Sequence, residues 1–338
     1  MRVLMTLCIG AGVAALGCSF IGLGFSLVND LFFRAGLMVI LAVSWNLMAS
    51  TGLISLGHSA FWGLGSYTSM LLVNSWSISF GTSIFAAILA GAAAGALLAV
   101  ATGRLRGIYF AVATIAFTEA LRVAAMMLPD ITGGSTGAYL NQSARLSQEF
   151  LYGAAIVGAV ASVTLVYLLM KTRLRYAMRA MLNNESAAQM LGVNPLLYRT
   201  FVSAVAGGLA ASAGVLNTWY TGYLSPEIAF SLHQSVLAQI ATIIGGVHTQ
   251  VGPIIGAFVI LGLSEITRVS LTEFEGTSQL IYGLVLVSFI LFLPGGIFGA
   301  MRNRWLSWAI GAKIRPLPTL KAQSSVIVSA KRERSPAS

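Results

Sequence analysis

Few residues of this 338-residue sequence could carry chemistry, and most of them are polar groups inside apolar stretches. Glu119 and Arg122, and again Glu265 and Arg268, are spaced i, i+3, which places an acid beside a base on one helix face. Ionisable groups inside membranes are often functional, and such a pair could hold the carboxylate and ammonium of a small zwitterion. The alternative, which we favour, is a local ion pair near a helix end.

The sequence shows no pattern typical of catalysis or of metal binding. A proton relay through His58 would need an acidic partner at the same depth, which the sequence does not display, so a packed, hydrogen-bonded histidine is the preferred interpretation. His233 and His248 have no metal-ligand spacing with a cysteine or an acidic cluster. No GxSxG, HExxH or paired-carboxylate arrangement stands at a plausible catalytic site, and the chain has no GxxxxGK[ST] phosphate loop. We therefore predict a protein that is not an enzyme, with no catalytic residue, no metal and no cofactor of its own.

Three stretches that interrupt apolar runs must position the polar groups. They are residues 51–67, 107–122 and 239–256, where glycines and hydroxyls stand among aliphatic residues. Glycine-broken helices at membrane depth are tolerated only where they face protein or a watery cavity, which is typical of a transport path; tight packing at helix ends is the alternative. The residues predicted to line the path are Asn46, Gly57, His58, Ser59, Thr114, Thr118, Glu119, Gly245 and Gly246.

A short polar segment, NNESAAQMLGVNP at 183–195, stands apart from these runs. Asn183 or Asn184 can cap a helix start, and Glu185 in the first turn suits the positive end of the helix dipole. The predicted helix has a small apolar face and stops after about two and a half turns. Because so short a helix is not stable alone in water, it must be packed against a partner, for which a soluble subunit with a groove is preferred over the bilayer surface. The residues predicted to make this contact are Asn184, Glu185, Ala187, Ala188, Leu191 and Gly192.

The composition indicates an all-α membrane protein. The chain is 57% hydrophobic and 9% charged, and its mean hydropathy is +0.84. Runs of 18 or more nearly uncharged residues are long enough to cross roughly 30 Å of hydrocarbon as helices, and strands of a membrane barrel would alternate instead. We predict a polytopic bundle of about 8–10 spans. The predicted spans are 5–26, 31–49, 56–74, 82–102, 107–127, 150–170, 197–220, 235–248, 252–270 and 277–298.

Charge placement predicts the orientation of the bundle. Segments on the side of the N-terminus hold 16 of the 20 basic residues but two of the ten acidic ones. This bias places both termini in the cytoplasm and explains the net charge of +10 without nucleic acid. We divide the chain into a transmembrane domain at 1–300, with a cytoplasmic loop at 171–199, and a basic tail at 301–338 that we expect to be disordered.

Several motifs together resemble one known family. ESAAQMLG (185–192) is similar to the E-A-A…G element of ATP-binding cassette (ABC) import permeases, with Ser186 where the common pattern has alanine. The wider chain, from about 36 to 299, resembles branched-chain amino acid permeases, in particular their M-type subunit. The matching stretches are WNL (45–47), GLISLGHSAFWGLGSY (52–67), RGIYFAVATIAF (106–117), ITGGSTG (131–137), RAMLNNESAAQMLGVN (179–194), IIGGVHTQVGPIIGA (243–257) and LFLPGGIFG (291–299).

The resemblance implies a multi-pass subunit in a bacterial inner membrane that forms the path for branched-chain or similar hydrophobic amino acids. The partners it implies are a second homologous permease, two cytoplasmic ATPases that bind the ATP, and an extracytoplasmic solute-binding protein. The loop 130–149 is a candidate contact for that binding protein, or a gate, with an ordinary turn as the alternative. Its candidate residues are Gly133, Gly134, Thr136 and Gly137, and Thr136 departs from the acidic or amide residue usual in the family.

Two other functions stay open on the sequence. An ion-coupled secondary transporter would move its substrate without an ATPase, so residues 183–194 distinguish it from an importer. An ABC permease for urea or amides would share the coupling element and differ in cargo. The exact substrate, and whether the permease pair is a homodimer or a heterodimer, are not encoded in any motif of the chain.

Overall fold

The computed structural model describes residues 26–141 and 144–270, together with isolated positions between 283 and 299. The predicted spans 5–26 and 277–298 and the predicted tail at 301–338 fall wholly or largely outside these residues. The longer helices of the described part are α2 (Ser26–Ala49), α3 (Ser59–Trp76), α4 (Phe80–Ala101), α5 (Ile108–Met126), α7 (Gln148–Leu169), α8 (Leu174–Asn183), α10 (Pro195–Thr221), α12 (Leu232–Gly245) and α13 (Gly252–Ser270).

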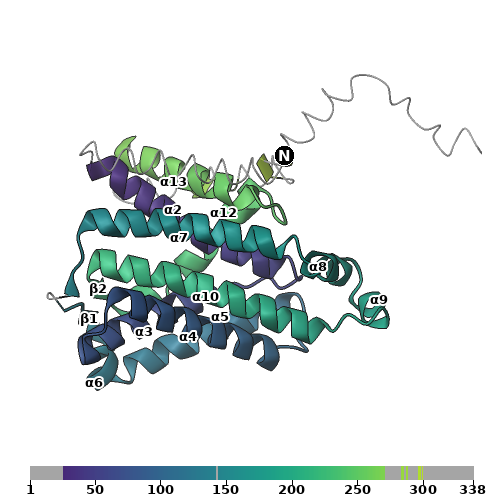
Figure 1. Ribbon diagram of the computed structural model, residues 1–338, viewed down its shortest axis with the longest axis horizontal. Coiled ribbons are helices and arrows are strands. Elements are labelled where there is room, and N and C mark those ends of the chain that lie inside the picture. Colours follow the sequence, from purple (N-terminus) through teal and green to yellow (C-terminus); the bar gives the residue numbers. More distant parts are fainter. Residues whose placement is uncertain are drawn as a thin grey trace, which may run out of the picture. The chain divides into compact units, whose positions relative to one another are not determined.

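Short elements connect these helices. They are α6 (Pro129–Thr132), the 3₁₀ turn η1 (Gly134–Thr136), α9 (Glu185–Met190), α11 (Pro226–Ala229), and the strands β1 (Ala138–Tyr139) and β2 (Tyr223–Leu224). The two strands pair antiparallel, with Ala138 opposite Leu224. They lie with α6 at one end of the bundle, whereas α8 and α9 lie at the other end (Figure 1).

The all-α prediction is confirmed for the described residues, six of whose helical segments are long and apolar enough to cross a membrane. These segments are Val28–Ala49, Phe80–Ala101, Ile108–Met126, Gln148–Leu169, Pro195–Thr221 and Pro226–Gly245. Helices α3 and α13 coincide with two further predicted spans. The predicted end of one span at residue 248 is wrong, because α12 stops at Gly245 before Gly246, whose φ of 121° suits glycine.

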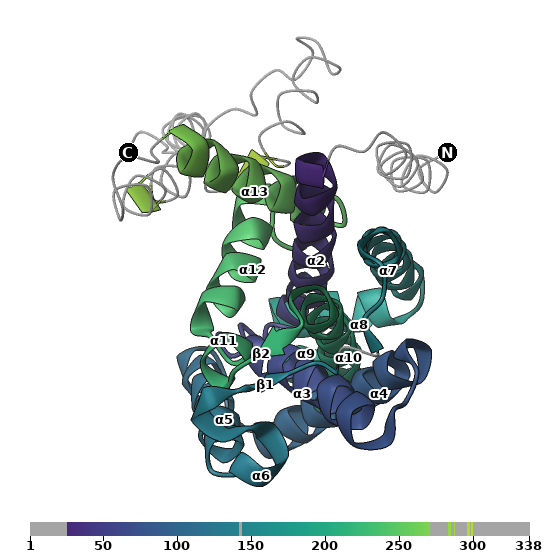
Figure 2. The ribbon, with the colours of Figure 1, turned by 90° about the vertical axis from the view of Figure 1, so that its left-hand side faces the viewer.

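Helix α10 occupies the centre of the bundle, between α4, α3, α2 and α7 (Figure 2). Asn194 caps its start with side-chain hydrogen bonds, Pro195 occupies its first turn, and Gly222 ends it with φ of 68°. Its buried residues are mostly small, and Ala206, Ala210 and several neighbours are 0% exposed. Helices in lipid gain little from the hydrophobic effect between them, so small residues that allow close backbone approach provide the packing.

The contact between α4 and α10 depends on GAAAG at 91–95, a small-xxx-small stripe whose sequence favours close packing in a Gly- and Ala-rich bundle. A Cβ added at Gly91 would overlap Gly207 and Ala211, and one added at Gly95 would overlap the carbonyl oxygen of Ser203. The packing interpretation is therefore confirmed, and it brings the backbones of two candidate spans into direct contact.

We predict that Gly95→Leu lowers the free energy of unfolding by at least about 1–3 kcal/mol, because the overlap is with backbone that cannot rotate away. The matched control is Gly81→Leu in the same helix, where an added Cβ meets nothing within 4 Å. Thermal unfolding of the purified chain compares the two variants. Equal melting temperatures for both would contradict the packing described here.

Candidate functional site

Helix α9 is a six-residue helix closed at both ends by local hydrogen bonds. The Asn184 side chain accepts a hydrogen bond from the Ala187 N–H at 3.1 Å, so the predicted N-cap is confirmed. Gly192, with φ of 84°, turns the chain out of the helix, and its N–H donates to the Gln189 carbonyl at 2.9 Å. The helix ends at Met190, so the predicted length of two and a half turns is wrong: Leu191 is already the C-cap residue, and the turn at Gly192 follows it.

The outward surface of α9 carries large apolar side chains. Met190 is 91% exposed and Leu191 is 81% exposed. Ala187 and Gly192 are also exposed, whereas Ala188 is 2% exposed and packs in an apolar cluster with residues of α8. The expectation that Ala188 shares the outward face with Ala187 and Leu191 is therefore wrong, since consecutive helical residues point about 100° apart and only Ala188 faces α8. The available contact surface consists mainly of Met190 and Leu191.

Glu185 anchors α9 to the bundle through two arginines. The Arg199 guanidinium, on α10, donates to both carboxylate oxygens of Glu185 at 3.0 and 3.2 Å. Arg106, from the loop between α4 and α5, donates to one of the same oxygens at 3.2 Å. The side chains of Arg199 and Glu185 are 7% and 14% exposed, whereas that of Arg106 is 63% exposed.

The Glu185–Arg199 pair therefore connects the helix at the end of the bundle directly to its central helix. Sequence reasoning assigned Glu185 to the helix dipole and counted Arg199 among the orienting positive charges. Glu185 and Arg199 are 14 residues apart and belong to different helices, so no helical spacing in the sequence indicated that they pair. The pair forms because Asn184 and Asn194 cap two successive helices, α9 and α10, and the turn between them brings the two side chains together.

A cavity of about 350 Å³ opens among α2, α3, α10, α12 and α13. Its floor is apolar and includes Leu41, Trp62 and Leu237. Arg34 lies two helical turns from Leu41 toward the start of α2, and polar side chains of α10, α12 and α13 complete the lining. Since α2 starts at the end that carries β1 and β2, the polar side of the cavity faces away from α9 (Figure 1).

Two residues of the cavity lining, Arg34 and Tyr220, share a carboxylate partner beside the cavity. Arg34 pairs with Asp30 at 2.8 Å, and the Tyr220 hydroxyl donates to the other oxygen of the Asp30 carboxylate at 2.7 Å. None of the residues predicted to line the path is among those that line the cavity. The sequence signal that could have pointed to this cavity is the i, i+4 spacing of Asp30 and Arg34. It resembles the i, i+3 spacing of the other acid–base pairs, such as Glu119 with Arg122.

Several predicted path residues hold broken backbone together, and their place in the path stays a prediction. Thr114 accepts the N–H of Gly57 at 3.1 Å, and Thr118 donates to the Gly57 carbonyl at 3.0 Å. A Cβ at Gly57 would overlap the Thr114 carbonyl, so the segment before α3 lies directly on α5. The hydroxyl of Ser235 on α12 accepts the Ser59 N–H at 2.7 Å. These residues form a packed crossing of three segments.

His58 and Asn46 have similar structural partners. His58 is 0% exposed, and its Nε2 lies 2.7 Å from the Ser44 hydroxyl, which confirms the packed, hydrogen-bonded interpretation. Asn46 accepts the His248 N–H at 2.9 Å and donates to the Thr249 carbonyl at 2.7 Å. An added Cβ at Gly245 would overlap Gly252, the first residue of α13. Together with Gly246, these residues shape the loop between α12 and α13.

Of the two acid–base pairs named from the sequence, the structure describes both side chains of one. Glu119 and Arg122 form the predicted local ion pair, and their side chains are 55% and 30% exposed. Glu119 therefore does not reach the cavity. The Arg268 side chain lies outside the described residues, so its pairing with Glu265 stays a prediction.

The glycine-rich loop lies at the end of the bundle away from α9. Gly133, Gly134 and Gly137 all have positive φ, of 80°, 59° and 75°. The Thr136 hydroxyl donates to the Gly133 carbonyl at 2.8 Å, and the Tyr223 hydroxyl donates to the Thr136 carbonyl at 2.9 Å. The loop is thus a set of fixed turns joined to the strand pair, with the Thr136 side chain exposed.

Comparison with known proteins identifies the family. The model of the family described as branched-chain amino acid transport system / permease component matches residues 27–290. The chain is 27% identical over 294 residues to the high-affinity branched-chain amino acid transport system permease protein LivM of Escherichia coli K12, covering 78% of this chain and 68% of LivM. No solved structure matches the chain.

Two further relatives are permease proteins for branched-chain amino acids and for autoinducer 2. The probable branched-chain amino acid transport permease protein LivH of Methanocaldococcus jannaschii is 27% identical, with 78% of this chain and 89% of LivH covered. The autoinducer 2 import system permease protein LsrC of Yersinia pestis is 26% identical, with 78% and 75% covered. Permeases of this family hold no cofactor, and their partner ATPases bind ATP. The chain belongs to the branched-chain amino acid transport permease family and is a non-enzymatic, multi-pass membrane permease of an ABC importer of the Liv/Lsr type.

Proposed function

We propose that this chain forms, with a second homologous permease, the path of a bacterial inner-membrane importer for branched-chain or similar hydrophobic amino acids. Both termini and α9 face the cytoplasm, where two ATPase subunits bind ATP. An extracytoplasmic binding protein delivers the cargo to the end that carries the loop at Gly133–Gly137. The observation that supports this arrangement is α9, a helix with an apolar outer surface and an ionic connection to the central helix.

The connection suits the transmission of force. Force transmission needs a rigid protrusion that contacts the ATPase. Met190 and Leu191 form this protrusion, which we call the knob, and each residue is more than four-fifths exposed. Movement of the knob reaches α10 through the Glu185–Arg199 pair and through Ala188, which packs beside α8. Because α10 contacts five other helices, a shift of α9 biases the whole bundle between two arrangements.

Cross-linking from position 190 tests the partner and the orientation together. A photoreactive residue at Met190, in the transporter assembled in membranes, is expected to capture the ATPase subunit. The matched position is Met127, which is 75% exposed at the opposite end of the bundle and should not capture it. Capture of lipid alone at position 190 would overturn the proposal.

An ion-coupled secondary transporter is distinguished by its energy source. The importer proposed here takes up labelled leucine into proteoliposomes only when ATPase subunits, ATP and the binding protein are all present. Leucine uptake by the isolated chain under an ion gradient would support the secondary transporter instead.

The cavity among α2, α10 and α12 supports a hydrophobic amino acid rather than urea as cargo. Its volume of about 350 Å³ lies at the lower end of small-ligand sites, which are roughly 300–1,000 Å³. Its apolar floor offers contacts to an aliphatic side chain, and Arg34 with Asp30 beside the cavity offers charges to a zwitterion. Urea has no group that would use the apolar floor.

We predict that Leu237→Trp, which narrows this floor, changes cargo preference. Leucine uptake should fall about tenfold or more relative to alanine uptake, because the larger side chain of leucine no longer fits the narrowed floor whereas that of alanine does. Competing uptake of the two labelled amino acids measures the ratio, which a general folding defect would leave unchanged. The matched control is Leu232→Trp on the same helix, at a residue that is 46% exposed and does not line the cavity. An unchanged ratio in Leu237→Trp would exclude the cavity from the path.

A further inference from the structure

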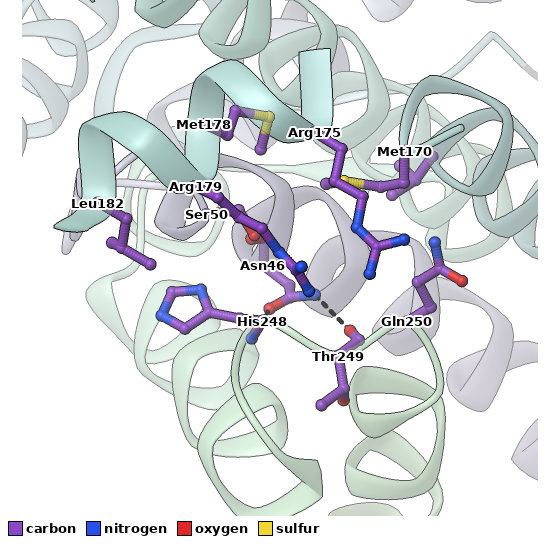
Figure 3. Close-up of a pocket in the computed structure, with 11 residues that line it drawn as sticks. Asn46, Ser50, Met170, Arg175, Met178, Arg179, Leu182, His248, Thr249 and Gln250 are labelled. Carbon is purple, nitrogen blue, oxygen red and sulfur yellow. Dashed lines mark hydrogen bonds between the residues drawn. The ribbon is translucent and has the colours of Figure 1, made fainter. Parts of the chain in front are cut away.

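A second, smaller cavity, of about 130 Å³, lies at the opposite end of the described bundle, beside α8 (Figure 3). Arg175 and Arg179 reach into it from α8, toward the loop that carries His248, Thr249 and Gln250. Nothing in the proposed transport path or in the contact with the ATPase uses this cavity. Its lining contains two guanidinium groups and no carboxylate.

The cavity lies where two candidate spans end. Asn46, which lines it, is in the last turn of the span Val28–Ala49, and Val166 and Met170 belong to the last turn of α7 and the residue after it. The ends of spanning helices mark the boundary between hydrocarbon and headgroups. The pocket is therefore at the depth of lipid phosphates.

Helix α8 has the character of a helix that lies along this boundary. It buries Leu174, Ala177, Met178 and Met181, while its other face carries basic residues and Tyr176, which is 73% exposed. Exposed basic residues and an exposed tyrosine suit the headgroup region beside spanning helices. The pocket is thus reached from the membrane surface.

The charge of the pocket is not balanced within the described residues. Arg34, Arg106, Arg122 and Arg199 each pair with a carboxylate, but in the described part of the chain Arg175 and Arg179 form no such pair. Partial burial lowers the pKa of His248, so this ring is neutral at pH 7 and adds no charge. Two positive charges, one helical turn apart, remain without a carboxylate partner among the residues that the structure describes.

The opposite wall of the pocket is held in place. Asn46 binds the loop at both His248 and Thr249. The Thr249 hydroxyl donates to the Gly246 carbonyl at 2.7 Å and accepts the Gly252 N–H at 3.0 Å. His248 has φ of 61°, a left-handed conformation that a non-glycine residue keeps only when its surroundings impose it. Such a wall loses little entropy when a ligand binds.

We propose that this pocket binds the phosphate of an anionic phospholipid headgroup from the leaflet at the α8–α9 end. Guanidinium groups bind phosphate oxygens in pairs, and basic pockets between spanning helices on the cytoplasmic side suit anionic headgroups. A lipid is favoured over a soluble phosphate because Val166, Met170 and Leu182 place apolar surface beside the charges, where acyl chains lie.

A bound headgroup would join α8 to the loop between α12 and α13. Helix α8 is followed directly by Asn184 and α9, so the lipid would hold the base of the coupling element. We therefore expect anionic lipid to raise ATP-driven uptake, in addition to binding the chain.

The binding test uses the full-length chain, purified from membranes and placed in nanodiscs or detergent with phosphatidylglycerol and phosphatidylcholine. Native mass spectrometry should show phosphatidylglycerol retained by the unaltered chain and retained about 30-fold less by Arg175→Gln/Arg179→Gln. The matched control, Arg173→Gln, removes the charge of the N-cap residue of α8, which does not line the cavity, and should retain the lipid. This measurement needs no transport activity.

Two results would overturn the proposal. Equal loss of lipid in Arg173→Gln would mean that surface charge alone attracts it. Displacement of phosphatidylglycerol by millimolar inorganic phosphate would indicate a site for a soluble anion. Arg175→Lys/Arg179→Lys keeps the charge and the fold, and its intermediate retention would assign the remaining affinity to paired guanidinium bonds.

Discussion

Replacing Glu185 by glutamine is expected to lower the free energy of unfolding by about 3 kcal/mol and to abolish ATP-driven uptake. The change leaves the Arg199 guanidinium, which is 7% exposed in its side chain, without a negative charge among the described residues. An unpaired buried charge costs far more than the pair contributes, since both groups have already been removed from water. Melting of the purified chain and uptake by the assembled transporter measure the two effects.

Two controls separate charge from position. Ser186→Ala alters the adjacent exposed residue and should leave both measurements unchanged. Glu185→Leu/Arg199→Met replaces the pair by apolar side chains, which is expected to restore the melting temperature but not the uptake, because the ionic connection to α10 is absent. If the double variant transported normally, the pair would have no part in coupling.

The pair Met190→Asp/Leu191→Asp is expected to weaken binding of the ATPase subunit by about 30-fold or more while the chain stays folded. Both side chains are more than 80% exposed, so the substitutions remove no internal packing. Large apolar side chains at the centre of an interface supply most of its binding energy, and a charge there must be dehydrated on association. Copurification of the ATPase with the tagged chain measures the loss.

The matched control for this change is Met127→Asp/Leu128→Asp at the far end of the bundle. These residues are 75% and 49% exposed and are adjacent in sequence, as Met190 and Leu191 are. Assembly with the ATPase should be unaffected by them. If both pairs reduced copurification equally, the effect would reflect general damage, and α9 would lose its assigned role.

Local chemistry made several features predictable from sequence. The Asn184 cap and the Gly192 stop follow from backbone needs that few residue types meet, and they define α9 at either end. The stripe at Gly91 and Gly95 indicated close helix packing, although its partner, α10, could not be named. Long apolar runs predicted helices, because in lipid the backbone must satisfy its own hydrogen bonds.

Contacts between distant segments could not be predicted. The glycines and hydroxyls around Gly57 gave no sign that this segment lies directly on α5. Ala187 and Ala188 have the same side chain, yet one is exposed and the other is buried, because the rotation of α9 about its axis depends on α8 and α10.

The sequence alone established a polytopic helical membrane protein, because the apolar character of each segment decides whether it lies in lipid or in water. It also established a short capped helix between residues 183 and 195, because capping depends on residues within one helical turn. The pairing of Glu185 with Arg199, the cavity floored by Leu41 and Trp62, and the two arginines that face the loop at Thr249 required the folded chain. Each of these unites groups from helices far apart in sequence, and their meeting depends on how backbones pack against one another rather than on any local preference.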